Sequence, residues 1–228
     1  FVFPERLIPY YSERPLYVDG CVLPITHEPI EPSQETRASL GLPEHAFVLV
    51  CFNNVYKFNP TLFAVWMRVL KQVDDAVLWL LDDNDSATQQ IQQHVASHGI
   101  AIERVVFAKR TSHLNYRARL QMADLYLDTT PYNAGSTARD VVDAGLPMVT
   151  FSGQTVVSRM AGSLLNSLGL SELVAHDAHA YEQLILALSN DRSRVATYRH
   201  TLLQSAPQRA GASARLTKSL EQQLLTLL

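Results

Sequence analysis

The chain has 228 residues, of which 47% are hydrophobic and 18% are charged, and its formal net charge is −3. This composition supports a packed core in one large domain or one and a half, and it excludes a disordered chain. The lack of a basic excess excludes nucleic acid as an expected partner, and no apolar run is long enough to predict a membrane partner.

The cysteines and the N-terminal residues indicate the cellular compartment and whether the chain is part of a longer protein. Cys21 and Cys51 are far apart, and Cys51 lies inside an apolar stretch, which predicts a buried, reduced thiol rather than a disulfide framework. No signal peptide is visible, and we expect a cytoplasmic protein. Because the chain begins at Phe1 rather than Met, we expect it to be part of a longer protein.

The chain divides into two predicted parts. Residues 1–34 are rich in proline and irregular, which is typical of a connector that runs over a surface or between two lobes. Order is expected from residue 35 to residue 228, where short apolar strands alternate with helices. The predicted strands are 46–52, 76–81, 104–107, 125–127, 147–150 and 173–174. The predicted helices are 35–40, 60–73, 85–98, 112–122, 136–144 and 156–168, followed by two or three C-terminal helices, the last at 214–228.

Local signals mark the ends of several of these helices. Asn59 is a predicted N-cap with Pro60 at the first helical position, and Asp85 or Ser86 is predicted to open the next helix. Gly145 is predicted to end the helix that starts near residue 136.

This alternation predicts an α/β fold with a parallel sheet and helices on both of its faces. In such sheets, ligands bind beyond the carboxyl ends of the strands, at a switch in strand order. The residues that directly follow the strands are therefore the candidates for a functional site.

The stretch 123–150 carries the strongest candidate. Its strand stops at Asp128, and a loop of turn-forming residues, 129–135, leads to Ser136 and Thr137, which we expect to cap the next helix. The start of such a helix suits a phosphate, and Asp140, one turn later on the same face, suits the hydroxyls of a ribose. The alternative is a capped helix packed on a sheet with Asp140 in solvent, and the stretch alone does not decide between them.

Other candidates follow the strands. Lys57 comes after the first apolar strand and is either a ligand for a diphosphate or an exposed loop lysine. Arg117 and Arg119 are two apart, so we expect one to reach the ligand and the other to be solvated. His113 and Tyr116 share a helix face, where they either flank a planar base or are ordinary surface residues.

Several familiar sites are not predicted. No spacing of His, Cys, Asp and Glu resembles a zinc site. The acidic turn of Asp82, Asp83 and Asp85 could hold Mg²⁺, but a solvated turn is the simpler interpretation. The chain lacks GxGxxG, GxxxxGK[ST] and GxSxG, so the phosphate loop must be of another type.

Three motifs in fixed order identify a family resemblance. FNNVYKFNP, RARLQMADLYLDTTPYNAGSTARDVVDAGLPMVT and SGQTVVSRMAGSLL together resemble the C-terminal half of the O-GlcNAc transferases. These enzymes glycosylate protein Ser/Thr residues, and the family includes bacterial relatives with tetratricopeptide repeats. The similarity runs from about residue 11 to residue 191.

The resemblance implies a fold and a site. It implies the C-terminal, Rossmann-like lobe of a GT-B-type glycosyltransferase, with residues 1–34 crossing from a missing N-terminal lobe. It implies a UDP-sugar as donor substrate, without cofactor or metal. The residues that it implies as donor ligands, with Lys57 at the diphosphate as the catalytic residue, are Asn54, Lys57, His113, Tyr116, Arg119, Gly135, Ser136, Thr137 and Asp140.

The sequence departs from the animal enzymes at several of these positions. Histidine stands there in place of Gly135 and of Tyr116, and lysine stands in place of His113. The loop at residues 152–155 reads Ser-Gly-Gln-Thr in this chain, where the family usually has Pro-Gly-Glu-Thr. The pair at 142–143 reads Val-Asp in this chain, where the family usually has Leu-Trp. Bacterial relatives are similar to this chain at Gly135 and Tyr116.

The functional prediction is inverting transfer of GlcNAc from UDP-GlcNAc to a protein hydroxyl. Lys57 and the helix start at Ser136 would stabilise the departing UDP. The general base is expected in the missing lobe and acceptor recognition in missing upstream repeats, so this piece is expected to be inactive alone. The alternatives are another UDP-sugar or a lobe that binds nucleotide-sugar or protein without catalysis. A phosphoacceptor module using Asp82 and Asp83 is a weaker alternative, because its acidic pair would be expected after the first strand.

Overall fold

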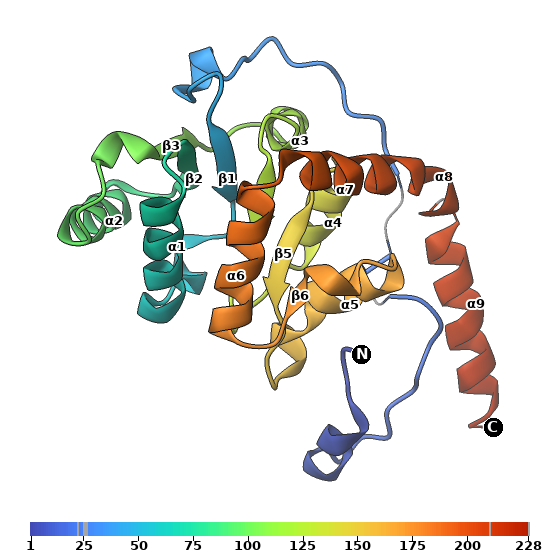
Figure 1. The fold of residues 1–228 in the computed structure, drawn as a ribbon. Coiled ribbons are helices and arrows are strands. Elements are labelled where there is room, and N and C mark those ends of the chain that lie inside the picture. The colour runs from blue at the N-terminus through green and yellow to red at the C-terminus, as the bar shows by residue number, and fades with distance from the viewer. Residues whose placement is uncertain (22, 25–26, 210, 228) are drawn as a thin grey trace.

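A computed structural model describes residues 1–21, 23–24, 27–209 and 211–227 (Figure 1). These residues form a parallel sheet of six strands in the order β3-β2-β1-β4-β5-β6. The strands are β1 (Phe47–Cys51), β2 (Ala76–Asp82), β3 (Val105–Lys109), β4 (Leu125–Leu127), β5 (Met148–Phe151) and β6 (Val174–Ala175). The order reverses between β1 and β4, which is the switch point of a Rossmann-like sheet.

Helices follow the strands along the chain. They are α1 (Pro60–Gln72), α2 (Asp85–Ser97), α3 (His113–Leu120), α4 (Ser136–Asp143) and α5 (Met160–Ser167). The C-terminal part adds α6 (Ala178–Ser189), α7 (Arg192–Gln204), α8 (Ala206–Arg209) and α9 (Ala212–Leu225). The crossover through α1 runs one way along the sheet and that through α4 the other way. Since crossovers between parallel strands are right-handed as a rule, these opposite directions place the two helices on opposite faces of the sheet.

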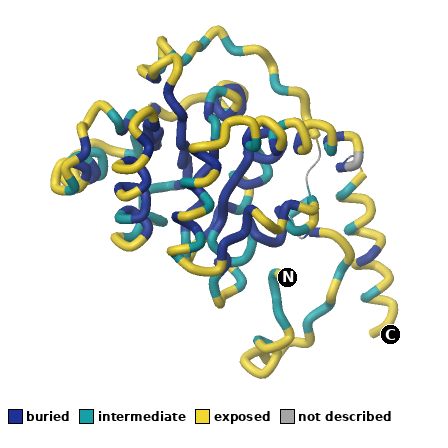
Figure 2. The backbone as a smooth tube through the Cα atoms, in the orientation of Figure 1, coloured by how far each residue is buried: buried dark blue, intermediate teal, exposed yellow. Residues whose placement is uncertain are grey.

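The core lies around β1, whose five residues are all buried (Figure 2). Phe47 pairs with Ala76 of β2, and Leu49 pairs with both Leu78 of β2 and Leu125 of β4. Helix α6 returns to lie beside α1 on one face (Figure 1). A central strand covered on both faces in this way must be apolar along its whole length, which explains the continuous run AFVLVCF.

Several predicted boundaries are confirmed. The Asn59 side chain accepts a hydrogen bond from the Leu62 amide, as an N-cap does. Gly145 has a φ of +71°, the left-handed conformation that ends helices. Cys51 is a buried free thiol, whose pKa is raised by burial.

Other boundaries differ from the prediction. Helix α2 begins at Asp85, as predicted, but its cap was not predicted: the Asn84 side chain accepts from the Ala87 amide. The predicted helix 35–40 is reduced to the 3-10 helix η2 (Ala38–Leu40), and the predicted helix 156–168 is divided into η5 (Val156–Ser158) and α5. In the described part of the C-terminal region, four helices replace the two or three expected.

The N-terminal segment contains the 3-10 helix η1 (Glu5–Tyr10) and otherwise runs without regular structure in its described residues. Asp19 donates its amide to Ser219 on α9, which ties this segment to the C-terminal helix. Figure 1 shows both ends of the chain on the same side of the molecule. The division into 1–34 and 35–228 remains a prediction.

Candidate functional site

A cavity of about 350 Å³ lies beyond the carboxyl ends of β1, β2 and β3, where the fold predicts a ligand. Helices α3 and α4 contribute to its wall. The lining residues are Phe52, Asn54, Leu81, Ala108, Lys109, Arg110, Thr111, His113, Tyr116, Arg119, Thr137 and Asp140. Six of the nine predicted site residues are therefore brought together. Lys57, Gly135 and Ser136 are outside this lining.

The start of α4 differs from the expected cap. Gly135 is the N-cap residue and Ser136 is the first helical residue. The prediction that Ser136 and Thr137 cap this helix is therefore wrong. As a glycine, this N-cap residue provides no side-chain cap for the first turn of α4. The amides of the first turn therefore have no N-cap side chain as acceptor. Such free amides suit a bound anion better than amides occupied by the predicted cap.

The loop before α4 is held by Asp128, which our sequence analysis did not single out as a site residue. One carboxylate oxygen accepts from the amides of Thr129 (2.8 Å) and Ala134 (2.7 Å) and from the Asn53 side chain (3.2 Å). The other accepts from the Thr150 hydroxyl at 2.7 Å. Complete burial raises the pKa of Asp128 to about 6, against the opposing effect of these hydrogen bonds. The sequence signal was an aspartate at the end of a buried strand.

Lys57 lies against the same loop. It ends the 3-10 helix η3 (Val55–Lys57), and its Nζ donates to the Asn133 carbonyl at 3.0 Å. The ammonium also lies 4.3 Å from the centroid of the Tyr132 ring, a cation–π contact. Lys57 is thus not the exposed loop lysine of one interpretation, because its ammonium is held beside the loop that leads into Ser136. Its role as a diphosphate ligand stays a prediction.

His113, Tyr116 and Asp140 form one wall of the cavity. The His113 Nε2 atom lies 3.4 Å from the Asp140 Oδ2 atom, and the rings of His113 and Tyr116 stack with centroids 6.0 Å apart. Burial raises the pKa of Asp140, and the hydrogen bond from His113 opposes this. Burial also raises the pKa of Tyr116. The wall therefore combines a carboxylate with two stacked rings.

The prediction for the arginine pair is wrong in one respect, because both side chains are buried. Arg119 lines the cavity, donates to both Glu35 oxygens at 2.9 and 2.5 Å, and donates to the Lys109 carbonyl at 2.7 Å. Arg117, expected in solvent, donates to Asp143 and to the Glu28 carbonyl, both at 2.6 Å. Neither guanidinium points into bulk water, since each is paired with a carboxylate from elsewhere in the chain.

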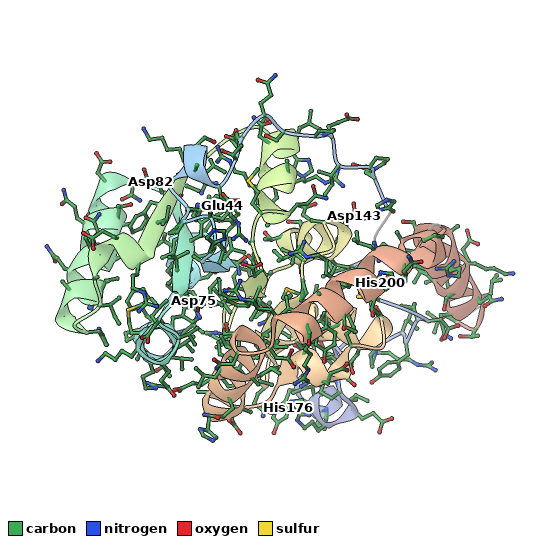
Figure 3. The ribbon with its side chains drawn as sticks, turned by 45° about the horizontal axis from the view of Figure 1, so that its top comes forward. Glu44, Asp75, Asp82, Asp143, His176 and His200 are labelled. Carbon is green, nitrogen blue, oxygen red and sulfur yellow. The ribbon has the colours of Figure 1, made fainter. Side chains whose placement is uncertain are left out.

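The acidic turn after β2 is held by side chains. Asp82 accepts from the Thr88 hydroxyl at 2.9 Å, and Asp83 pairs with Arg110 at 2.5 Å. Figure 3 shows Asp82 at one end of β2 and Asp75, which precedes the strand, at the other. Within the described residues, no three His, Cys, Asp or Glu side chains gather to hold a metal ion.

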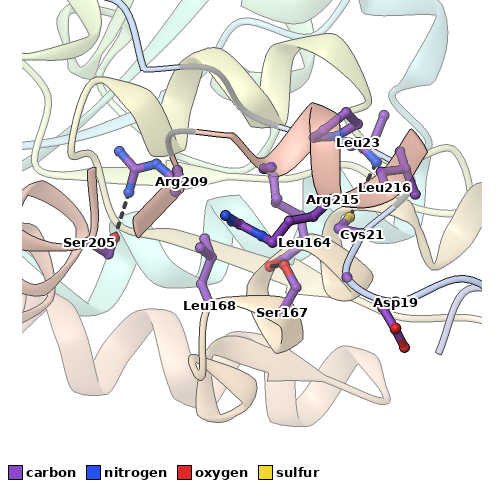
Figure 4. A pocket seen from close by; sticks show the side chains of 13 residues that line it. Asp19, Cys21, Leu23, Leu164, Ser167, Leu168, Ser205, Arg209, Arg215 and Leu216 are labelled. Carbon is purple, nitrogen blue, oxygen red and sulfur yellow. Dashed lines mark hydrogen bonds between the residues drawn. The ribbon is translucent and has the colours of Figure 1, made fainter. Parts of the chain in front are cut away.

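A second cavity of about 260 Å³ lies between the N-terminal segment, α5 and the helices α8 and α9 (Figure 4). Leu164, Leu168 and Leu216 form its apolar part, and Arg209 and Arg215 its basic part. None of the predicted site residues lines it. It is therefore separate from the cavity at the strand ends.

Strand order, helix start and cavity together define a Rossmann-like lobe of the class that binds nucleotides at its switch point. The particular family follows from comparison, because the model of glycosyl transferase family 41 matches residues 26–213. The chain belongs to this family, and the family resemblance seen in its motifs is confirmed.

Individual relatives agree with this assignment. The chain is 33% identical over 164 residues to the UDP-N-acetylglucosamine–peptide N-acetylglucosaminyltransferase of Caenorhabditis elegans, covering 72% of this chain and 14% of that protein. It is 28% identical over 202 residues to the probable enzyme SEC of Arabidopsis thaliana, covering 86% of this chain and 21% of that protein. The chain thus spans about a fifth or less of these two relatives.

Solved structures support the fold. A mutant of the Thermobaculum terrenum O-GlcNAc transferase superposes with a TM-score of 0.81 and 24% identity over 97% of this chain and 43% of that one. The predicted fold class, the Rossmann-like C-terminal lobe of a GT-B-type glycosyltransferase, is confirmed. No described helix has the length and apolar character needed to cross a membrane.

Proposed function

We propose that this chain is the donor-binding lobe of an enzyme that transfers GlcNAc from UDP-GlcNAc to protein Ser/Thr hydroxyls with inversion. The family assignment and the names of the nematode and Arabidopsis relatives support the donor and the protein acceptor. Such an enzyme is expected in the cytoplasm, with its acceptor bound through regions upstream of this chain.

The observation that carries the proposal is the position of Lys57 on the loop that opens α4. Its bond to the Asn133 carbonyl places an ammonium beside a helix start without a side-chain cap. Negative charge grows on the diphosphate as the sugar–oxygen bond breaks. A fixed cation and a helix dipole stabilise that charge without reorganising, which lowers the barrier to UDP departure.

The remaining residues are assigned to the rest of the donor. Asp140 accepts hydrogen bonds from the ribose hydroxyls, and Gly135, Ser136 and Thr137 provide amides and hydroxyls for the diphosphate. Asn54 lies near the sugar–phosphate bond. The uridine contacts are assigned to the wall residues His113, Tyr116 and Arg119, of which the first two carry the stacked rings.

Inversion also requires that the acceptor hydroxyl lose its proton on the opposite face of the sugar. Among the donor-site residues we identify no general base, and we assign that role to the N-terminal lobe. The 228-residue chain therefore binds UDP but does not turn over.

Titration calorimetry of the chain with UDP, with uridine as comparator, tests the donor site. We expect UDP to bind more tightly than uridine, because only UDP reaches Lys57 and the start of α4. A folded chain that gives no heat with UDP contradicts the proposal. A sugar-transfer assay on the full-length protein, comparing UDP-GlcNAc with UDP-glucose, then separates a GlcNAc transferase from one that uses another UDP-sugar and from a lobe without catalysis.

A further inference from the structure

Arg110 joins the carboxyl ends of three neighbouring strands at the mouth of the cavity. It directly follows β3, and its Nη2 atom donates to Asp83 after β2 at 2.5 Å and to Asn54 after β1 at 2.6 Å. Arg110 and Asn54 both line the cavity. A guanidinium at this point lies beside Asn54, only three residues before Lys57.

The ion pair that holds Arg110 is a weak one. The Arg110 side chain is 57% exposed and that of Asp83 is 26% exposed, so water screens their attraction. The hydrogen bonds to Asp83 and Asn54 leave from the same terminal nitrogen, whereas a guanidinium carries five N–H donors in a fork that matches phosphate oxygens. The ion pair with Asp83 therefore occupies only part of the N–H donors of the Arg110 guanidinium.

Two other cations around the site, Arg119 and Lys57, are held more firmly. Arg119 is buried and donates to both carboxylate oxygens of Glu35. Lys57 is fixed on the Asn133 carbonyl and the Tyr132 ring. Arg110 is by contrast an exposed arginine that lines the cavity, and an anion bound in the cavity would compete with Asp83 for its guanidinium.

We propose that Arg110 is a second cationic ligand of the donor's diphosphate, and that it exchanges Asp83 for that diphosphate when the donor binds. The inference rests on the proposed function, since it adds a residue to the same donor site. In the absence of the donor, Asp83 then takes the place of the diphosphate as the anionic partner that holds Arg110 at the cavity. The two residues should affect UDP affinity in opposite directions.

Calorimetric titration of the 228-residue chain with UDP and with uridine tests this. Arg110→Gln should weaken UDP binding about tenfold, the size of a lost charge-assisted hydrogen bond, and leave uridine binding within about twofold. Arg110→Lys should show a smaller loss. Asp83→Asn should strengthen UDP binding by about two- to fivefold, because the competing carboxylate is gone.

Arg192→Gln is the matched control. Arg192 is 52% exposed and pairs with Asp75, before the start of β2 and away from the cavity. We expect this variant to bind UDP and uridine like the unchanged chain. Circular dichroism of each variant verifies that it is folded.

Two results would overturn this inference without contradicting the proposed function. One is that Asp83→Asn weakens UDP binding as Arg110→Gln does, which would make the pair a fixed part of the scaffold. The other is that Arg110→Gln weakens UDP and uridine equally or neither of them. If the unchanged, folded chain binds no UDP at all, the proposed function fails, and this inference fails with it.

Discussion

Lys57 donates a hydrogen bond of 3.0 Å to the carbonyl oxygen of Asn133, so a cation from the segment after β1 rests on the loop that leads into α4. The two residues belong to neighbouring crossovers on either side of the switch between β1 and β4. The contact places the Lys57 ammonium at the switch point of the sheet, where the positive end of the α4 dipole is the second source of positive charge.

Replacing Lys57 by Met removes this charge and keeps most of the apolar stem. We expect UDP affinity to fall at least tenfold in the chain, with uridine affinity unchanged, and transfer by the full-length enzyme to be lost. Lys57→Arg, which keeps the charge, should retain part of the UDP affinity. Transfer that persists in the Met variant would remove Lys57 from its assigned role.

Asp140→Asn tests the ribose assignment. The variant cannot accept two strong bonds from the ribose, so we expect UDP affinity to fall about tenfold in calorimetry. The comparator is 2′-deoxy-UDP, which lacks one of these hydroxyls and should lose less when Asp140 is changed. Because burial raises the pKa of Asp140, UDP affinity should also decline on acidification at a higher pH than for an ordinary aspartate. Equal losses for both nucleotides would contradict the assignment.

Asp128 predicts a pH dependence of stability. Its folded pKa of about 6 lies above the ordinary 3.8, so between these values the folded state holds more protons than the unfolded state. The free energy of unfolding therefore decreases as pH rises from about 4 to 6, by on the order of 3 kcal/mol from this group. Urea unfolding across this range, compared with Asp128→Asn, isolates the contribution, because the amide does not titrate. A variant with the same pH slope as the unchanged chain would contradict the raised pKa.

Asp143 predicts a large effect of a single substitution. Its carboxylate accepts from His27 and from Arg117 at 2.6 Å, and lies 3.6 Å from Arg209. Because both arginines are 4% exposed, Asp143→Ala leaves them without this counter-charge and should lower the free energy of unfolding by about 3–5 kcal/mol.

Urea denaturation measures this loss against an exposed pair. Asp75→Ala breaks the Arg192–Asp75 contact, where both side chains are more than half exposed, and should cost less than about 1 kcal/mol. Similar losses for the two variants would show that the Asp143 cluster is not a buried ion network in solution.

The features that the sequence predicted correctly depend on neighbours along the chain. The Asn59–Pro60 start of α1 and the end of α4 at Gly145 were readable because a cap or a left-handed glycine is specified within one helical turn. The strand cores were readable because a sheet covered on both faces requires continuous apolar runs. The alternation of elements then gave the parallel sheet.

The features that it missed depend on distant partners. Arg117 looked like a solvated residue because its partners are far along the chain, Glu28 at 89 positions and Asp143 at 26. Ser136 and Thr137 have the chemistry of caps, but the preceding loop is held by Asp128, so Gly135 takes the cap position instead. Arg110 carries no local signal, since its partners follow two other strands.

The Asp128 carboxylate ties the end of β1, through Asn53, to the loop before α4 and to Thr150 of β5. Tyr181 of α6 fixes the same point from the far side, by donating to the Asp128 carbonyl at 2.9 Å. The backbone that leads into α4 is thereby held by side chains from three other parts of the fold. For the proposed UDP donor, we therefore expect a small entropic penalty for ordering the backbone here, and a binding rate set by encounter rather than by closure of this loop.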